Sequence, residues 1–462
     1  MQGGNIVLLF TLAIGFVMAM IDVTAVNTAL GSISADLHVP LSGLVWVVDG
    51  YTLTFAAFLL AGGALADRIG ARQTYQGGLL VFVAGSLACA LAPSGNALVA
   101  ARLLQGTGAA LFMPSSLSLL THAAPNDTAR TRMVGTWSAL VGCAATVGPL
   151  VGGLLVHEFG WRSVFWINLP LGLAGIVLAQ MLAPAPAAHR RPLSMLSHVL
   201  GVLTLAALSF LLIEGPVRGW TSASVVAASF FALLFAGVLV WRERAAAHPI
   251  LPRALLASSS FAAANFTGFL INFAVFGQIF LLSLFFQQAH GSNALETGMK
   301  ILPMLAASTI GNFLSGRVIA RTGTRPSLLG GLAVSALMGA VLTRTGPHTP
   351  YLLMMAGVLV MYLAIGLAIP AMTTTVMQVA GKTHANIAAA ALNANRQIGA
   401  LVGVAAMGSI LHAVEDWGWR LTLGFGAIGL AYGIACLLVH QRVRQHLPQS
   451  GADPDATLQA GH

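Results

Sequence analysis

Long apolar runs, each about as long as a membrane-spanning helix, follow one another along almost the whole chain. A helix needs about 20 apolar residues to cross the hydrocarbon core of a bilayer. A transmembrane barrel would instead show alternating segments of about ten residues, and the sequence lacks that pattern. We therefore expect an all-α polytopic membrane protein. The fourteen expected helices lie near 5–30, 41–63, 74–93, 97–120, 132–156, 163–184, 196–214, 221–241, 261–286, 294–318, 326–345, 350–372, 386–412 and 420–440.

The composition supports a membrane protein, because 57% of the residues are hydrophobic and only 8% are charged. A soluble protein carries about 25% charged residues. The formal net charge of +9 invites comparison with nucleic-acid-binding proteins. However, the basic residues form short clusters between apolar runs, without a basic stripe interleaved with aromatic residues. We therefore expect no nucleic-acid partner, and we expect the lipid bilayer to surround the chain.

The sequence offers no candidate metal, cofactor or nucleotide site. Its thirteen histidines show no ligand spacing, and its three cysteines lie singly within apolar runs. No phosphate loop of the form GxxxxGK[ST] is present. We therefore expect a protein that is not an enzyme, that holds no metal or cofactor and that draws its energy from an ion gradient.

The distribution of positive charge orients the predicted bundle. Most of the 22 lysine and arginine residues fall in the loops that share one side of the membrane with both termini. Because cytoplasmic loops carry the excess of positive charge, this side is assigned to the cytoplasm. The sequence thus predicts a multi-pass protein of the cell inner membrane with both termini cytoplasmic.

An internal repeat indicates how the helices are grouped. "GALADRIGAR" begins at Gly63 and "GRVIARTGTR" begins at Gly316, an offset of 253. "ALVGCAA" at 139–145 returns as "ALVGVAA" at 400–406, an offset of 261. Two echoes at similar offset predict two six-helix bundles with a pair of helices inserted between them. The predicted parts are an N-terminal bundle (1–184), an inserted two-helix segment with linkers (185–257), a C-terminal bundle (258–445) and a disordered cytoplasmic tail (446–462).

Five motifs together resemble the major facilitator superfamily, and within it the fourteen-span drug:proton antiporters. They are "IDVTAVNTAL", "GGALADRIGAR", "RLLQGTGAA", "VGPLVGG" and "WRSVFWINLPLG", and the resemblance covers about residues 5–440. The form "WVVDGY" in the second helix is similar to the subgroup that exports quaternary-ammonium and other lipophilic cations. The resemblance implies two bundles that rock against each other around a substrate site near the middle of the membrane.

Asp22 is an acid within the first apolar run. Intramembrane acids are costly and usually functional, and burial away from water favours the protonated form of a carboxyl group. We therefore expect Asp22 to couple transport to protons, a role that the resemblance also implies. Arg102, in the fourth helix, is expected at the same depth, where it could pair with Asp22. The alternative is a carboxylate satisfied by Thr24 or a neighbouring helix, with no titration during transport.

Asp49 is a second acid, in the outer half of the second predicted helix. Facing the same cavity as Asp22, it could hold a cation, and Trp46 and Tyr51 could add cation–π contacts. The two aromatic residues could equally be interfacial anchors. Asn27 and Gln105 complete the expected substrate-binding set.

Three further groups of residues are expected to control conformation rather than to bind ligands. The residues are Gly63, Asp67, Arg68, Gly70 and Arg72 in the loop after the second helix; Gly148, Pro149, Gly152 and Gly153 in the fifth; and Arg396, expected at the cytoplasmic end of the thirteenth. The resemblance implies that the loop braces the two halves and that the glycine motif of the fifth helix forms a hinge or a tight seal, since glycines permit tight turns and close helix contact. Simple helix packing, and for Arg396 a solvated helix end, are the alternatives.

The sequence therefore predicts a monomeric, proton-coupled antiporter that exports lipophilic, cationic drugs or biocides by alternating access. One alternative is a dedicated exporter of a neutral or anionic metabolite or antibiotic that uses the same proton step. The other is a proton symporter that imports a nutrient, which the "VGPLVGG" motif argues against.

Overall fold

The structure is a computed structural model, and it describes residues 3–123, 126–183, 195–246, 249 and 251–443. Within these residues every regular element is a helix, which confirms the all-α prediction. The first half comprises α1 (Gly3–Leu37), α2 (Leu41–Ile69), α3 (Ala71–Ala90), α4 (Gly95–His122), α5 (Asp127–Phe159), α6 (Ser163–Trp166) and α7 (Asn168–Leu182).

The rest of the described chain continues with two inserted helices and then the second half. The inserted helices are α8 (Met195–Arg218) and α9 (Ala223–Ala245), followed by a short α10 (Arg253–Leu256). The second half comprises α11 (Ser259–Leu284), η1 (Phe285–Ala289), α12 (Ala294–Thr322), α13 (Thr324–Leu342), α14 (Tyr351–Ala413) and α15 (Trp417–Arg442).

A helical segment is present at each of the fourteen predicted positions, with α6 and α7 forming one of them and α14 forming two. In the described part of the chain, 11 helices are both long and apolar enough to cross a membrane. The remaining three segments are α3, α12 and the arm 382–413 of α14, which fall outside those 11. The chain is therefore a multi-pass membrane protein, and a count of fourteen spans stays a prediction.

Several helix boundaries follow from local sequence. Asn293 and Glu296 form a reciprocal capping box at the start of α12. Asp416 accepts a hydrogen bond from Trp419 N at 3.0 Å and so caps α15. At Gly381 the backbone has φ of 65°, which favours glycine, and this residue bends α14 into two arms.

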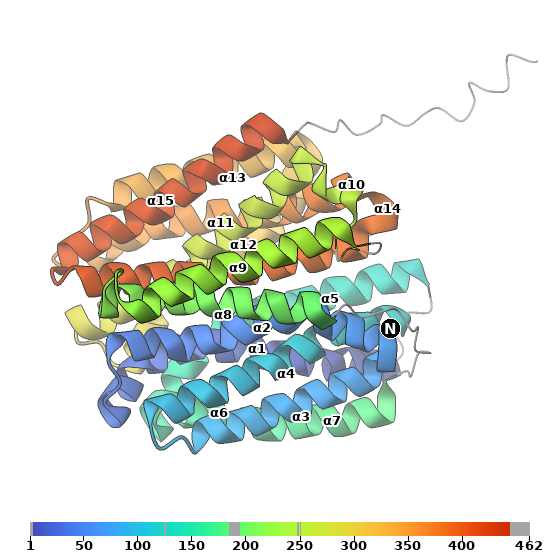
Figure 1. Cartoon of the computed structure of the whole chain (residues 1–462), viewed down its shortest axis with the longest axis horizontal. Helices are drawn as coiled ribbons and strands as arrows, with labels where there is room; N and C mark the ends of the chain where they lie inside the picture. Colours follow the sequence, from blue (N-terminus) through green and yellow to red (C-terminus); the bar gives the residue numbers. More distant parts are fainter. Residues whose placement is uncertain (1–2, 124–125, 184–194, 247–248, 250, 444–462) are drawn as a thin grey trace, which may run out of the picture.

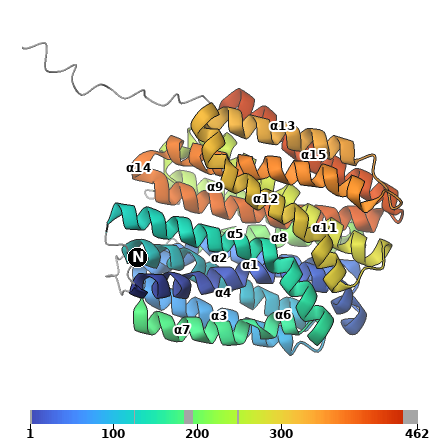
Figure 2. The same cartoon turned by 180° about the vertical axis from the view of Figure 1, so that it is seen from behind.

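The two halves form separate bundles with the inserted helices lying across them. Figure 1 shows α1–α7 in one group and α11–α15 in the other, with α8 and α9 between the groups on the near side. Figure 2 shows the opposite side, where α5 and α12 lie side by side. α8 contacts α2 of the first half and α14 of the second. The expected fold of two six-helix bundles and an inserted pair is confirmed, and the predicted tail 446–462 lies outside the described residues.

The two halves repeat one another in detail. Gly70 (φ 102°) forms the turn between α2 and α3, and Gly323 (φ 87°) forms the turn between α12 and α13. Two residues after the first turn, Arg72 donates to Ala183 O at 3.5 Å, just after α7. Two residues after the second turn, Arg325 donates to His440 O at 2.9 Å, in the last turn of α15. Each arginine therefore ties the third predicted span of its half to the end of the sixth: α3 to α7 in the first half, and α13 to α15 in the second.

The contacts between the halves lie between the predicted outer end and the middle of the bundle. Gln287 of η1 accepts a hydrogen bond from Gly31 N at 2.7 Å and donates to Asn27 O at 3.1 Å. Thr146 of α5 and Thr309 of α12 share a hydrogen bond of 2.6 Å. We name this contact region the seam: the surfaces of α1, α2 and α5 that meet η1, α12 and the arm 382–413 of α14.

Candidate functional site

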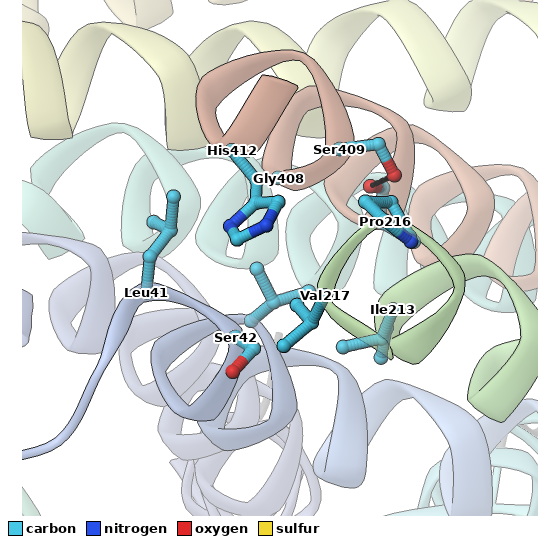
Figure 3. A pocket seen from close by; sticks show the side chains of 10 residues that line it. Leu41, Ser42, Ile213, Pro216, Val217, Gly408, Ser409 and His412 are labelled. Atoms are coloured by element: carbon cyan, nitrogen blue, oxygen red, sulfur yellow. Dashed lines mark hydrogen bonds between the residues drawn. The ribbon is translucent and has the colours of Figure 1, made fainter. Parts of the chain in front are cut away.

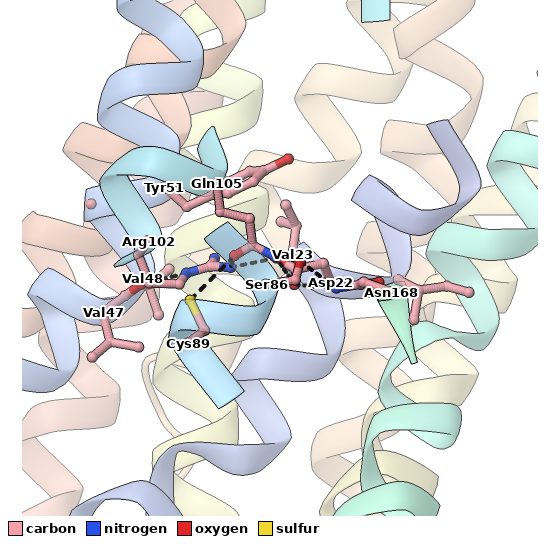
Figure 4. Close-up of polar contacts among 12 residues, drawn as sticks. Asp22, Val23, Val47, Val48, Tyr51, Ser86, Cys89, Arg102, Gln105 and Asn168 are labelled. Atoms are coloured by element: carbon pink, nitrogen blue, oxygen red, sulfur yellow. Dashed lines mark hydrogen bonds and ion pairs between the residues drawn. The ribbon is translucent and has the colours of Figure 1, made fainter. Parts of the chain in front are cut away.

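Asp22 lies near the middle of α1 and is 1% exposed, surrounded by hydrogen-bond donors (Figure 4). Arg102 Nη1 donates to Asp22 Oδ2 in a buried ion pair. Gln105 Nε2 donates to Asp22 Oδ1 at 2.8 Å, and Asn168 Nδ2 donates to the same oxygen at 3.2 Å. The predicted pairing of Asp22 with Arg102 is confirmed. Thr24, the alternative partner, donates instead to Met20 O at 2.8 Å.

Arg102 and Gln105 are themselves held by further contacts. Arg102 Nε donates to Val47 O at 3.0 Å, and its guanidinium carbon lies 4.5 Å from the centre of the Tyr51 ring. Gln105 accepts a hydrogen bond from Arg102 Nη1 at 2.6 Å and donates to Ser86 Oγ at 2.9 Å. A buried charge pair is stable only when its remaining polar groups are satisfied, and this one meets that requirement.

The elements that build this network all belong to the first half. Asp22 comes from α1, Ser86 from α3, Arg102 and Gln105 from α4, and Asn168 from the start of α7. We name these five residues the Asp22 network. Because one bundle encloses it, a change of charge at Asp22 acts first on the packing of α1, α3, α4 and α7 against one another.

Asp49 lies in different surroundings from Asp22. It is fully buried, and neither carboxylate oxygen has a hydrogen-bond partner. One turn earlier on α2, Val45 packs against Gly408 of α14, so Asp49 faces the same helix across the seam. The expectation of two acids facing one cavity is therefore not met, because Asp22 is enclosed within the first bundle.

The other expected substrate-binding residues contact the protein itself. Trp46 Nε1 donates to Glu214 Oε1 of α8 at 2.9 Å, beside a pocket of about 590 Å³ near the predicted outer end. The Tyr51 ring faces Arg102. Asn27 Nδ2 donates to Val23 O at 3.0 Å within α1. The structure thus does not gather these side chains around one ligand pocket with Asp22, and their binding roles stay predictions.

The glycine motif of α5 packs closely against two helices. Gly148 and Gly152 face α1, where a side chain at Gly152 would lie 2.5 Å from Ala25 Cβ. Gly153 faces α12, where a side chain would lie 2.6 Å from Ala294 O. Pro149 O lies against Gly298 of α12. These residues bring α5 close to the first helix of its own half and to the second half at once.

The loop motif lies at the predicted inner end. Asp67 and Arg68 are exposed in the last turn of α2. A Cβ built on Gly63 would lie 3.9 Å from Pro114 Cβ of α4. Arg72 ties α3 to the residue after α7, so its described contact lies within the first half. Bracing between the two halves by this loop stays a prediction.

Arg396 is not at a helix end. The structure places it near the middle of the arm 382–413 of α14, half-buried, which corrects the expected position. The arm is longer than the apolar run from which the helix was predicted, because it extends without a break to the bend at Gly381.

Sequence reasoning missed three residues that the structure makes prominent. Asn168 is a direct partner of Asp22, Gln287 bridges the halves, and Glu214 is held by Trp46 and by Arg218 at 2.7 Å. A polar side chain inside or beside an apolar run was the available signal for each of them.

A second, smaller pocket lies where α2, α8 and α14 meet (Figure 3). Ser42 of α2, Pro216 of α8 and His412 of α14 contribute to its wall. Next to it, Ser409 Oγ donates to Leu212 O at 3.0 Å and ties α14 to α8. The inserted helix α8 is therefore bonded to both halves at the same end of the bundle.

No group of three or more histidine, cysteine, aspartate or glutamate residues within the described ranges could hold a metal ion. The sequence profile of the Major Facilitator Superfamily matches residues 12–404 and 266–459. The chain belongs to the major facilitator superfamily. It is accordingly a transporter and not an enzyme.

Individual proteins of the superfamily resemble the chain over most of its length. It is 47% identical to the methylenomycin A resistance protein of Bacillus subtilis, over 94% of each chain. It is 44% identical to the methylenomycin A resistance protein of Streptomyces coelicolor, over 91% of this chain and 89% of that protein. Multidrug resistance protein Stp of Mycobacterium tuberculosis is 34% identical, over 89% of this chain and 77% of that protein.

Solved superfamily structures share the fold at low sequence identity. The inward-open xylose transporter XylE of E. coli matches with a TM-score of 0.67 and 12% identity, over 96% of this chain and 98% of that one. A peptide transporter POT matches with a TM-score of 0.69 and 15% identity, over 94% and 93%. At this level of identity the comparison establishes the arrangement of helices only.

Proposed function

We propose that this superfamily member exports small drug-like molecules across the inner membrane in exchange for protons. The similarity to proteins named for methylenomycin A resistance and multidrug resistance supports export of a drug. The buried Asp22–Arg102 pair is the observation that carries the proton step. We further propose that the protein acts as a monomer with both termini cytoplasmic.

The proton step follows from the contacts of Asp22. Protonation would remove the negative charge that holds Arg102, Gln105 and Asn168 together. The four helices that meet there would then pack differently, and the outer contacts of α1 with the second half would change. Loss of the proton to the cytoplasm restores the ion pair. This gives two states of one bundle, which alternating access requires.

Replacement of Asp22 by asparagine tests the proposal. In vesicles containing the full chain, a pH gradient should drive uptake of methylenomycin A or ethidium by the wild type, and Asp22→Asn should reduce uptake to the level of protein-free vesicles. Asp22→Glu, which keeps a carboxyl group at this position, should retain part of the wild-type uptake.

An exchange assay separates this prediction from a failure to fold. At equal pH on both sides, Asp22→Asn should still exchange labelled for unlabelled drug, because this exchange needs no net proton movement. Gradient-driven export by Asp22→Asn at the wild-type rate would refute the coupling role.

The charge of the drug divides the proposal into two forms. Export of lipophilic cations would require Asp49 to bind the cation after the seam opens, since Asp49 is fully buried in this state. Export of an anionic drug is favoured by a different observation: Arg396 is half-buried, and it takes part in none of the ion pairs of the described residues. Asp49→Asn should abolish export of ethidium in the first case and spare export of methylenomycin A in the second.

A further inference from the structure

Arg396 is a permanent positive charge near the middle of its helix, and its half of the molecule provides no acid to balance it. Between residues 259 and 442 the sequence contains three acidic residues, Glu296, Glu415 and Asp416, and the last two lie directly before α15 at the predicted outer end. Glu296 caps the start of α12 at the predicted outer end, remote from the middle of the bundle. By contrast, Arg102 in the first half has Asp22 as its partner.

A second hydrogen-bond donor without an acceptor lies beside Arg396. Asn265 of α11 is only 9% exposed, and its Nδ2 has no acceptor. Asn395 Nδ2 donates to Asn265 O at 2.7 Å, which fixes the two helices against each other at this point. Asn265 and Arg396 are therefore held next to each other at the contact between α11 and α14.

The local packing leaves room for the arginine stem. Gly268, one turn after Asn265, faces Arg396, and a Cβ built on it would lie 3.3 Å from Arg396 Cγ. A larger residue at this position would displace the stem. The absence of a side chain at Gly268 thus lets the stem of Arg396 lie against α11.

Two unpaired donors at the contact between α11 and α14, one of them permanently charged, call for an acceptor that carries negative charge. A guanidinium presents five N–H groups in a fixed plane that matches the two oxygens of a carboxylate. A buried amide N–H without a partner is costly, so an acceptor that also reaches Asn265 gains further stabilisation. Asp22 cannot serve, because Arg102, Gln105 and Asn168 already occupy it.

We propose that Arg396 and Asn265 form the subsite for an anionic oxygen group, a carboxylate, on the molecule that this protein exports. The inference rests on the proposed export function and assigns it a substrate class. In superfamily transporters with this architecture the substrate site lies between the repeats. Arg396 lies on the inner side of that region, because its neighbour Asn395 is bonded to Asn265, near the predicted inner start of α11. The first half then supplies the proton site and the second half the anion site.

Thermal unfolding of the purified, delipidated full-length protein tests the subsite directly. Nalidixate, salicylate and fluorescein serve as lipophilic carboxylate probes, and the amide of each serves as its neutral match. The wild type should be stabilised by at least one carboxylate more than by its amide. Arg396→Gln should weaken binding of that carboxylate and raise its Kd by about ten- to hundredfold, as expected when a charged hydrogen bond is lost.

Three variants make the outcome specific. Arg396→Lys keeps the charge but not the planar fork and should bind with intermediate affinity. Asn265→Ala should weaken binding less than Arg396→Gln does. Arg218→Gln, which removes an arginine from α8, should leave carboxylate binding unchanged. A ligand-free unfolding temperature close to wild type shows that Arg396→Gln is folded.

Three results would overturn the proposal. It fails if no carboxylate is preferred over its amide, or if Arg396→Gln binds carboxylates as the wild type does. It also fails if phosphatidylglycerol, in place of the carboxylates, gives the stabilisation that depends on Arg396, since the occupant is then a lipid. Carboxylate binding that survives Asp22→Asn while proton-driven export does not would separate this subsite from the export mechanism itself.

Discussion

At the scale of single residues, the two acids of the first half differ in what surrounds them. Asp22 accepts hydrogen bonds from three side chains, whereas Asp49 accepts none. Both were visible in the sequence as acids within apolar runs, but their partners were not. Asn168 lies far from Asp22 along the chain, and only the packing of α7 against α1 and α3 brings its amide to that carboxylate.

The lone carboxyl group of Asp49 leads to a stability prediction. A buried polar group without a partner costs about 1–3 kcal/mol, and replacing it with an apolar group of similar size removes this cost. Asp49→Leu should therefore raise the unfolding temperature of the purified protein by a few degrees, measured by differential scanning fluorimetry in detergent.

A matched replacement should act in the opposite direction. Asp36 accepts hydrogen bonds from Trp161 at 2.9 Å and Arg162 at 2.6 Å, so Asp36→Leu should lower the unfolding temperature. A decrease for Asp49→Leu as well would show that Asp49 has a partner in the folded protein.

At the scale of helices, the positions of the elements were largely predictable and their depth and contacts were not. Apolar runs located a helical segment at all fourteen expected sites, because a membrane helix must be apolar over most of its length. Arg396 was assigned to a helix end because the apolar run is shorter than the helix that contains it. Hydropathy reports where apolar residues are, whereas the helix continues through polar residues to the bend at Gly381.

The contact between α1 and α5 gives a prediction at this scale. Gly152→Val would place a branched side chain against Ala25, so the two helices would have to move apart. The variant should unfold at a lower temperature and lose export. On the same helix, a Cβ at Gly142 meets nothing within 4 Å, so Gly142→Ala should be neutral or slightly stabilising. Equal effects of the two variants would mean that helix propensity, not packing, decides the result.

At the scale of the whole molecule, the two bundles are built as independent bodies. Arg72 and Arg325 make equivalent hydrogen bonds in the two halves, so each bundle is stabilised by its own contact between helices. The sequence repeat predicted this symmetry, but it could not show where the bundles touch. The seam depends on pairs such as Val45 and Gly408, which no repeat or periodicity brings together.

Closing the seam covalently should stop transport. In a variant without native cysteines, Val45→Cys and Gly408→Cys should cross-link under mild oxidation, since a Cβ on Gly408 would lie 2.5 Å from Val45 Cγ2. Export should cease and return on reduction, because the halves must separate here to open outward. The pair Leu342→Cys and Gly357→Cys lies within the second half and should cross-link without loss of export. Export that continues with the seam cross-linked would exclude rocking about this contact.

The attachment of α8 to both halves has a consequence for how the inserted pair moves. Its bond to the first half, from Trp46 to Glu214, involves a carboxylate, whereas its bond to the second half, from Ser409 to Leu212 O, joins two uncharged groups. Charge-assisted hydrogen bonds are roughly twice as strong as neutral ones. When the halves part, we therefore expect the Ser409–Leu212 bond to break first and the inserted helices to move with the N-terminal bundle.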